Sequence, residues 1–219
     1  SDKQYQIENK YIAEGNVIIN FNNIYLKTDK FSYDINSKII NLIGNIVFIS
    51  GEQFLQASQI EFNTISQKGF IKDVYGTANF KTLDLLNSNK NKKLNLSDFK
   101  DIDKSIKNVK LQKSSSIGLN NFATPQNITF KFNEMTKWRF QTKEIRIENN
   151  IWFSDILYLT NDPYNKPQII IENRDFKSIN KNSYVNIQAK SSWLILEDSL
   201  KIPLGRRDYK NNKIENTTR

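Results

Sequence analysis

An internal repeat restricts the fold of this chain more than any other feature of the sequence. The segment AEGNVIINFNNIYLKTDKFSYD (residues 13–34) is followed, without a gap in the alignment, by LIGNIVFISGEQFLQASQIEFN (residues 42–63). Gly15 therefore aligns with Gly44, and a third unit is predicted to start at Gly76, in YGTANF. A period of about 30 residues is typical of stacked units, each of which buries its apolar face against its neighbours.

Each repeat divides into short apolar segments rich in Val, Ile, Phe and Tyr, separated by polar turns such as DINSK and NTISQKG. Alternating apolar residues between turns of this kind predict β-strands, and no helix signal interrupts residues 11–81. We expect Gly15, Gly44 and Gly76 to allow a tight bend where a strand leaves a turn. The predicted fold is all-β, a stacked antiparallel β-jellyroll.

The alternation also predicts which side chains of the repeats point inward. These residues recur in both copies: Val17, Ile19, Leu26, Phe31, Tyr33, Ile46, Phe48, Leu55, Ile60 and Phe62. If two sheet layers meet, these side chains interdigitate and form an ordinary core. If the layers splay along one side, the same side chains line a long apolar trough, and the sequence leaves both arrangements open.

The rest of the chain divides into an insertion, a continuation and a tail. Residues 82–125 are rich in Lys, Asn and Ser, and within them residues 98–110 have the spacing of a short amphipathic helix; a disordered insertion is the alternative. Residues 126–207 continue the strands, because FQTKEIRIE (140–148) repeats the pattern of LKTDKFSYD. Later strands are predicted at NIWFSDILYLT, PQIIIENRDF, YVNIQAKS and SWLILEDSLKIP. This match adds three inward positions: Phe140, Ile145 and Ile147. Residues 208–219 are predicted to be a polar tail.

The composition limits the chemistry that the chain can perform. It has neither His nor Cys, and carries 32 Lys and Arg against 23 Asp and Glu, a net charge of +9. Without the commonest catalytic bases, nucleophiles and soft metal ligands, we expect no enzyme, no cofactor and no metal site. The basic charge favours an anionic partner, or reflects an AT-rich coding sequence that also enriches Asn and Ile. The sequence has no apolar run long enough to cross a bilayer as a helix.

The two repeats, with Gly-Asn-apolar followed by Leu-x-Thr or Leu-x-Ala, resemble the OstA/LptA-type β-jellyroll family. Thr28-Asp29 and Ala57-Ser58 depart from the Ala-Asp of that pattern. The resemblance implies an open, V-shaped stack of strands that binds lipopolysaccharide (LPS), with the thirteen inward residues lining a lipid trough. Its rim would hold anionic headgroups through basic side chains. These are Lys27, Lys30, Lys143, Arg146, Arg206 and Arg207.

The later segments WRFQTKEIRIENNIWFSDILYLTNDPYNKPQIII and LILEDSLKIPLGRR look more like the cyanobacterial LptD-like proteins than like the short bridge proteins. That likeness implies a domain at the periplasmic face of the outer membrane, cut from an exported protein that continues into an outer-membrane barrel. It also implies a periplasmic LPS bridge protein as partner, joined by edge-strand pairing.

Three other interpretations stay open at this point. The chain could be a soluble bridge protein of the LptA/LptC type, a closed structural β-solenoid, or a polyanion-binding module.

Nucleic acid is not an expected partner, because the basic residues are scattered and no nucleic-acid motif interleaves them with aromatic residues. The carboxylates near turns lack the spacing of a catalytic acid and base pair. They are Asp155, Asp162, Asp175 and Asp198.

Overall fold

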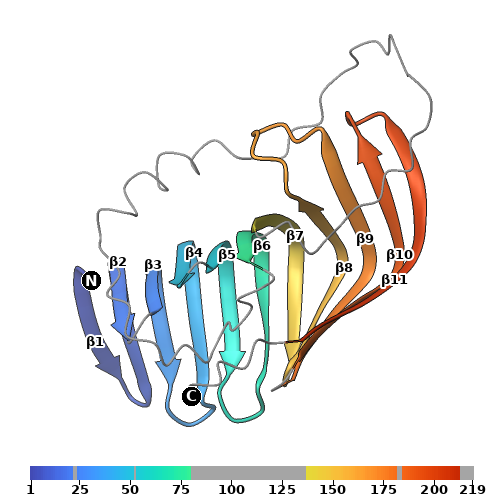
Figure 1. Cartoon of the computed structure of the whole chain (residues 1–219). Helices are drawn as coiled ribbons and strands as arrows, with labels where there is room; N and C mark the ends of the chain where they lie inside the picture. Colours follow the sequence, from blue (N-terminus) through green and yellow to red (C-terminus); the bar gives the residue numbers. More distant parts are fainter. Residues whose placement is uncertain (22–23, 52, 80–136, 182–183, 213–219) are drawn as a thin grey trace, which may run out of the picture.

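The protein is an open sheet of eleven strands in chain order, each antiparallel to the next (Figure 1). This computed structural model describes residues 1–21, 24–51, 53–79, 137–181 and 184–212. No helix occurs within these ranges, and the predicted all-β, jellyroll-like fold is confirmed. The insertion at 82–125, with its predicted helix at 98–110, lies outside the described residues.

Most strands are ten to thirteen residues long, and only the first is short. In chain order they are β1 Lys3–Ile7, β2 Lys10–Phe21, β3 Ile24–Asp34, β4 Ile39–Ser50, β5 Gln53–Asn63, β6 Lys68–Asn79, β7 Lys137–Glu148, β8 Ile151–Thr160, β9 Ile169–Asn180, β10 Tyr184–Leu196 and β11 Leu200–Asn212. β6 pairs with β7, so the two halves of the sequence share one sheet. β10 unites YVNIQAKS with the start of SWLILEDSLKIP, and β11 extends into the predicted tail.

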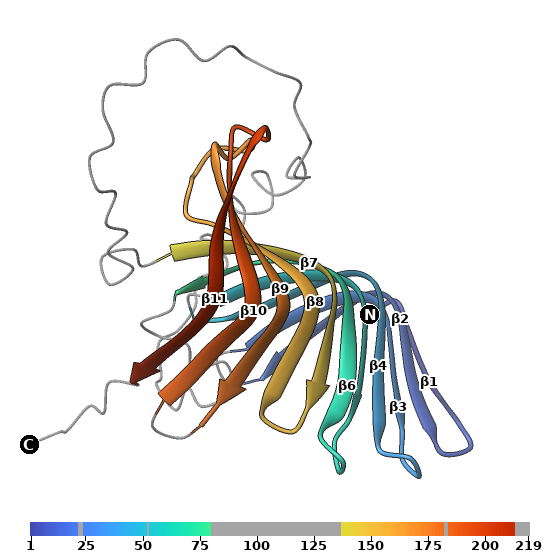
Figure 2. The same ribbon diagram turned by 90° about the vertical axis from the view of Figure 1, so that its right-hand side faces the viewer.

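The strands bend near their middle, so that the sheet is folded along a line that crosses them (Figure 2). We call this line the corner, its inner side the concave face and its outer side the convex face. One apolar cluster contains Leu55 and Phe48 from one side of the corner together with Ile60 and Ile147 from the other. Only on the inner side of a fold do residues from both limbs approach one another, so this cluster marks the concave face.

The repeated Gly-Asn pair makes the bends of β2 and β4. Gly15 and Asn16 have φ of 74° and 44°, and Gly44 and Asn45 have φ of 78° and 42°. The strand register shifts at both places, between Glu14 and Val17 and between Ile43 and Ile46. Two successive residues at positive φ need glycine or a tolerant side chain such as Asn, and they form a bulge that turns the strand. The prediction that these glycines follow turns was wrong, because both lie within strands.

The third unit of the repeat does not start at Gly76. The residue that follows Gly44 at the spacing between Gly15 and Gly44 is Asp73, which has φ of 52° and accepts a hydrogen bond from Ser58 Oγ at 2.6 Å. Asp tolerates left-handed backbone, so the bend survives without glycine. Gly76 lies opposite Phe140, where an added Cβ would come within 2.5 Å of the Phe140 ring. It makes room for an aromatic ring and does not bend the chain.

Small polar side chains fill the inside of the corner. Thr28 is fully buried, and its hydroxyl oxygen lies 3.0–3.2 Å from the carbonyl oxygens of Lys30, Ile43 and Gly44, which share its one donor proton. Further along, buried Thr142 and Ser154 share a hydrogen bond of 2.6 Å. Ser192 Oγ donates to Asn173 Oδ1 at 2.7 Å in the same way. These bonds satisfy buried polar groups at and near the bends, and so stabilise the corner.

The turns repeat with the same period as the bends. Asp34 Oδ1 accepts from the backbone N–H groups of Asn36 and Ser37 at 2.9 and 3.0 Å. Asn63, which the repeat aligns with Asp34, accepts from the second and third residues after it in the same way, at 3.0 and 2.8 Å. Such Asx turns fix a tight reversal. In Asp34 the backbone bonds from Ser37 and Asn36 lower the pKa of the carboxyl below its ordinary value.

Replacing Gly44 by Ala should destabilise the protein by more than replacing Gly51 by Ala. Both residues have positive φ, at 78° and 59°, so each alanine costs about 1–2 kcal/mol in backbone strain. Only at Gly44 would the new Cβ lie 2.5 Å from Asp29 Oδ2, which accepts a hydrogen bond from Asn45 Nδ2 at 2.7 Å. Loss of that bond adds about 1 kcal/mol.

The measurement is the free energy of unfolding in urea, with Gly51→Ala as the control for backbone strain because nothing lies within 4 Å of its added Cβ. Equal losses for the two variants would show that the Asp29 contact plays no part in the bend.

Candidate functional site

The concave face carries an unbroken apolar row across ten strands. Its members are opposite one another in the register of the sheet, so their side chains point to the same side. They are Ile19, Leu26, Phe48, Leu55, Gly76, Phe140, Leu159, Ile171, Leu194 and Ile202. Nine inter-strand spacings of about 4.8 Å give the row a length of about 43 Å. The row is therefore a continuous apolar strip, in which Leu55, Gly76, Ile171 and Leu194 are buried and the other members are more exposed.

A second row runs along the other limb of the concave face and spans all eleven strands. It consists of Gln6, Tyr11, Tyr33, Ile40, Phe62, Gly69, Ile147, Trp152, Ser178, Ile187 and Tyr209. Six of these residues are aromatic or large aliphatic side chains between β3 and β10. Toward the two ends lie the exposed Tyr11, next to Gln6, and Tyr209. The concave face is thus most apolar in its middle, and its side chains are more polar and more exposed to solvent at both edges of the sheet.

All thirteen residues predicted to line the trough lie on the concave face. Ile46, Leu55 and Ile145 are buried members of its core cluster. Six more are partly buried and pack against that cluster: Leu26, Phe31, Phe48, Ile60, Phe140 and Ile147. The remaining four are at the same side in the register: Val17, Ile19, Tyr33 and Phe62. The structure brings these side chains together, and their role in binding lipid stays a prediction.

Several residues of this face were missed by sequence reasoning. Leu42, Ile71 and Val74 belong to the same cluster, and Trp138, Ile171 and Leu194 form a second cluster toward the C-terminus. Ile71 follows Leu42 at the same spacing that relates Gly15 to Gly44, so the repeat would have found it. No repeat signal marks Trp138, which follows the described residues of β6 only after a long insertion.

The N-terminal edge of the concave face contains a groove of about 430 Å³. Its apolar wall comes from Val17, Ile19 and Phe31, and its polar wall from residues of β1 such as Gln4 and Gln6. Tyr11, which is also part of the lining, is half exposed. This end of the apolar surface therefore opens to solvent beside polar groups.

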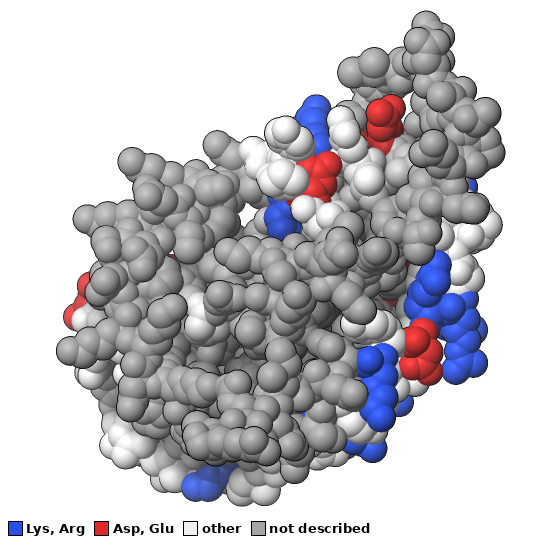
Figure 3. Space-filling model, viewed as in Figure 1, with Lys and Arg blue, Asp and Glu red and all other residues white. Residues whose placement is uncertain are grey.

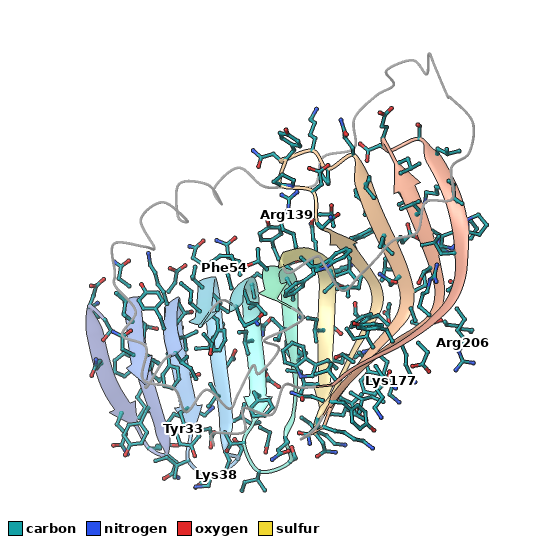
Figure 4. All side chains as sticks on the ribbon, viewed as in Figure 1. Tyr33, Lys38, Phe54, Arg139, Lys177 and Arg206 are labelled. Carbon is teal, nitrogen blue, oxygen red and sulfur yellow. The ribbon has the colours of Figure 1, made fainter. Side chains whose placement is uncertain are left out.

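Five of the six predicted rim residues lie on the convex face. Each of them is outside the concave rows: Lys27, Lys30, Lys143, Arg146 and Arg206. Basic side chains gather at the lower right of Figure 3, in the region where Figure 4 labels Lys177 and Arg206. Only Arg207 is on the concave face, opposite Ala189. The basic residues therefore do not form one continuous rim along the apolar rows.

Two of these five predicted rim residues are engaged in ion pairs. Lys30 Nζ lies 2.6 Å from Glu14 Oε1, and Arg146 Nη2 lies 2.5 Å from Asp155 Oδ1. The hydrogen bond with Lys30 holds the pKa of the Glu14 carboxyl below its ordinary value, and the same bond raises the pKa of Lys30. Both pairs are solvent-exposed and stabilise the fold only slightly.

The part of the chain that the structure describes shows no group of His, Cys, Asp and Glu side chains that could hold a metal ion. It also contains no helix that is long and apolar enough to cross a membrane. The described site is a long apolar surface, which can bind apolar chains by removing them from water.

Residues 132–218 match a family described as a protein of unknown function, DUF3769. The match covers less than half of the chain and includes all of β7 to β11. The comparison with curated proteins gave no match. The comparisons therefore identify strands β7 to β11 as similar to a domain of unknown function, and the structure shows that these strands belong to an all-β antiparallel sheet.

Proposed function

We propose that the chain is an OstA/LptA-like domain that binds lipopolysaccharide on its concave face and passes it along the apolar rows at the periplasmic side of the outer membrane. The observation that carries the proposal is the ten-residue row from Ile19 to Ile202, which contains no charged residue. An enzyme pocket concentrates chemistry at one place, whereas this surface repeats the same chemistry from strand to strand.

The physical argument rests on the acyl chains of the lipid. Each CH₂ group that leaves water for an apolar surface contributes about 0.8 kcal/mol. Because most strands of the row offer a large apolar side chain, such as Leu26, Phe48 or Leu55, an acyl chain exchanges one contact for another as it moves. Its free energy changes little between neighbouring strands, and the open sheet leaves the polar headgroup in water.

The partner in this proposal is a periplasmic LPS bridge protein that pairs with the N-terminal edge of the sheet. β1 pairs only with residues 10–14 of β2, and no described strand pairs with residues 17–21 on that side. Unpaired backbone groups on an edge strand can accept a further strand. Such pairing would extend the concave rows into the partner.

The test is site-specific photocrosslinking in cells that contain LPS. A photoreactive phenylalanine analogue at Phe48 or Phe62, both on the concave face, should form an adduct with LPS. The matched control is Val47, which neighbours Phe48 on β4 but points to the convex face, and it should give no adduct. Adducts of equal yield at Val47, or none at either concave position in the folded protein, would contradict the proposal and favour a closed structural module.

A further inference from the structure

Arg207 is the one charged residue on the concave face among the described strand side chains. The hydrogen bond from Gln188 Nε2 to Asp208 Oδ2, at 3.0 Å, holds Asp208 on the convex side of β11. Its neighbour in sequence, Arg207, therefore points to the other side, opposite the buried Ala189. Arg206 precedes it at the bend made by Gly205, whose φ is 74°, and points away from the sheet (Figure 4).

Three other arginines of the C-terminal half have protein partners, whereas Arg206 points away from the sheet. Arg174 Nε lies 2.8 Å from Glu172 Oε1, Arg146 pairs with Asp155, and Arg139 donates to the carbonyls of Asp162 and Tyr164. No ion pair or hydrogen bond joins Arg207 to any described residue. Its guanidinium is therefore open to an external anion.

The surroundings of Arg207 are apolar and accessible. Tyr209 and Ile202, on the same face of β11, are 39% and 38% exposed, and Leu204 packs against the second apolar cluster. A cation in the middle of the rows would have to lose water against apolar side chains, which is costly. On the last described strand, at the sheet edge, the guanidinium of Arg207 stays hydrated although the neighbouring side chains on this face are apolar.

We infer that Arg207 is an anion site at the C-terminal end of the concave face and binds the phosphate of an amphiphile whose acyl chain lies on the apolar rows. This inference rests on the proposed function. A guanidinium presents paired N–H donors that match two phosphate oxygens, so the contact also orients the headgroup. The site thus distinguishes phosphorylated amphiphiles from those with uncharged heads.

The experiment measures binding of dodecyl phosphate and of dodecyl maltoside to the full chain, each below its micelle concentration. Arg207→Gln should weaken binding of dodecyl phosphate about tenfold, the effect expected for losing a charged hydrogen-bond partner, and leave dodecyl maltoside unchanged. Arg206→Gln, the adjacent position on the convex side, should change neither. Arg207→Lys, a second variant that keeps the charge without the paired donors, should lose less than Arg207→Gln.

The outcomes separate this inference from the function on which it rests. If the wild-type chain binds both amphiphiles and Arg207→Gln changes neither affinity, the phosphate site is wrong and lipid binding on the concave face remains. If the folded wild-type chain binds neither amphiphile, both the site and the proposed function are overturned. An equal loss in the Arg206 and Arg207 variants would indicate a general charge effect and would also overturn the site.

Discussion

Replacing Ile46 by Asp should unfold the protein or destabilise it by at least about 4 kcal/mol. Ile46 is 1% exposed and lies at the corner, opposite Ala57 and within the concave cluster. Truncating a buried isoleucine costs about 2–5 kcal/mol, and burying an unpaired carboxylate adds to that loss. Because whole domains are stable by only about 5–15 kcal/mol, this one change removes much of the margin.

Ile43→Asp is the matched control, because it makes the same chemical change slightly earlier on β4. Ile43 is 45% exposed on the convex face, opposite Lys30 and Gln59, so its substitution should change the free energy of unfolding by less than about 0.5 kcal/mol. Urea unfolding followed by tryptophan fluorescence and circular dichroism gives both values. A similar cost at the two positions would mean that the apolar cluster does not lie on the side of the sheet assigned to it.

The fold class was predictable because the signals behind it are local. Alternating apolar residues and Asx turns recur at a fixed spacing, and each depends only on residues near it in sequence. The same spacing located the bends of β2 and β4. At β6 the same spacing leads to Asp73, but the prediction followed the glycine to Gly76. The backbone there needs only a residue that tolerates positive φ, and Asp73 suffices.

The faces of Lys27, Lys30 and Arg146 follow from their inward neighbours, but the face of Arg207 was not predictable because the alternation changes phase at every bend. Lys72 with Asp73, and Arg174 with Asp175, are successive exposed residues at the corner, and in a straight strand one residue of each pair would point inward. If the alternation of side chains is continued through a bend, every residue beyond the bend in that strand is therefore assigned to the wrong face of the sheet. Arg206 and Arg207 look like one basic pair in the sequence, yet the bend at Gly205 places them on opposite faces.

The same phase change explains how one strand was divided into two in the sequence. Within β10, the concave positions shift from Ala189 to Ser192, and the register with β11 shifts between them. In a sequence, the end of a strand also appears as a break in period-2 alternation. A bend and a turn are distinguished only by whether pairing with the neighbouring strand continues, and that information lies far away in the chain.

A single acidic residue on the concave row should remove most of the affinity for an acyl chain. Phe48 is a partly buried member of the row, between Leu26 and Leu55. In Phe48→Glu, a solvated carboxylate replaces an apolar ring, so an acyl chain would lose contact with about three CH₂ groups. At about 0.8 kcal/mol for each, the loss of about 2.4 kcal/mol corresponds to roughly 50-fold weaker binding. Binding of dodecyl maltoside to the full chain measures this, since its uncharged head is not repelled by the new carboxylate.

Val47→Glu provides the control on the same strand, because its side chain points to the convex face and is opposite Lys27 and Gln56. It introduces the same charge at the adjacent position and should leave the affinity for dodecyl maltoside unchanged. Urea unfolding of both variants identifies any loss of binding that comes from loss of the fold, since Phe48 also packs against the core cluster. If folded Phe48→Glu binds as tightly as folded Val47→Glu, apolar chains do not lie on the concave row, and the repeated strands of this sheet serve only to build its core.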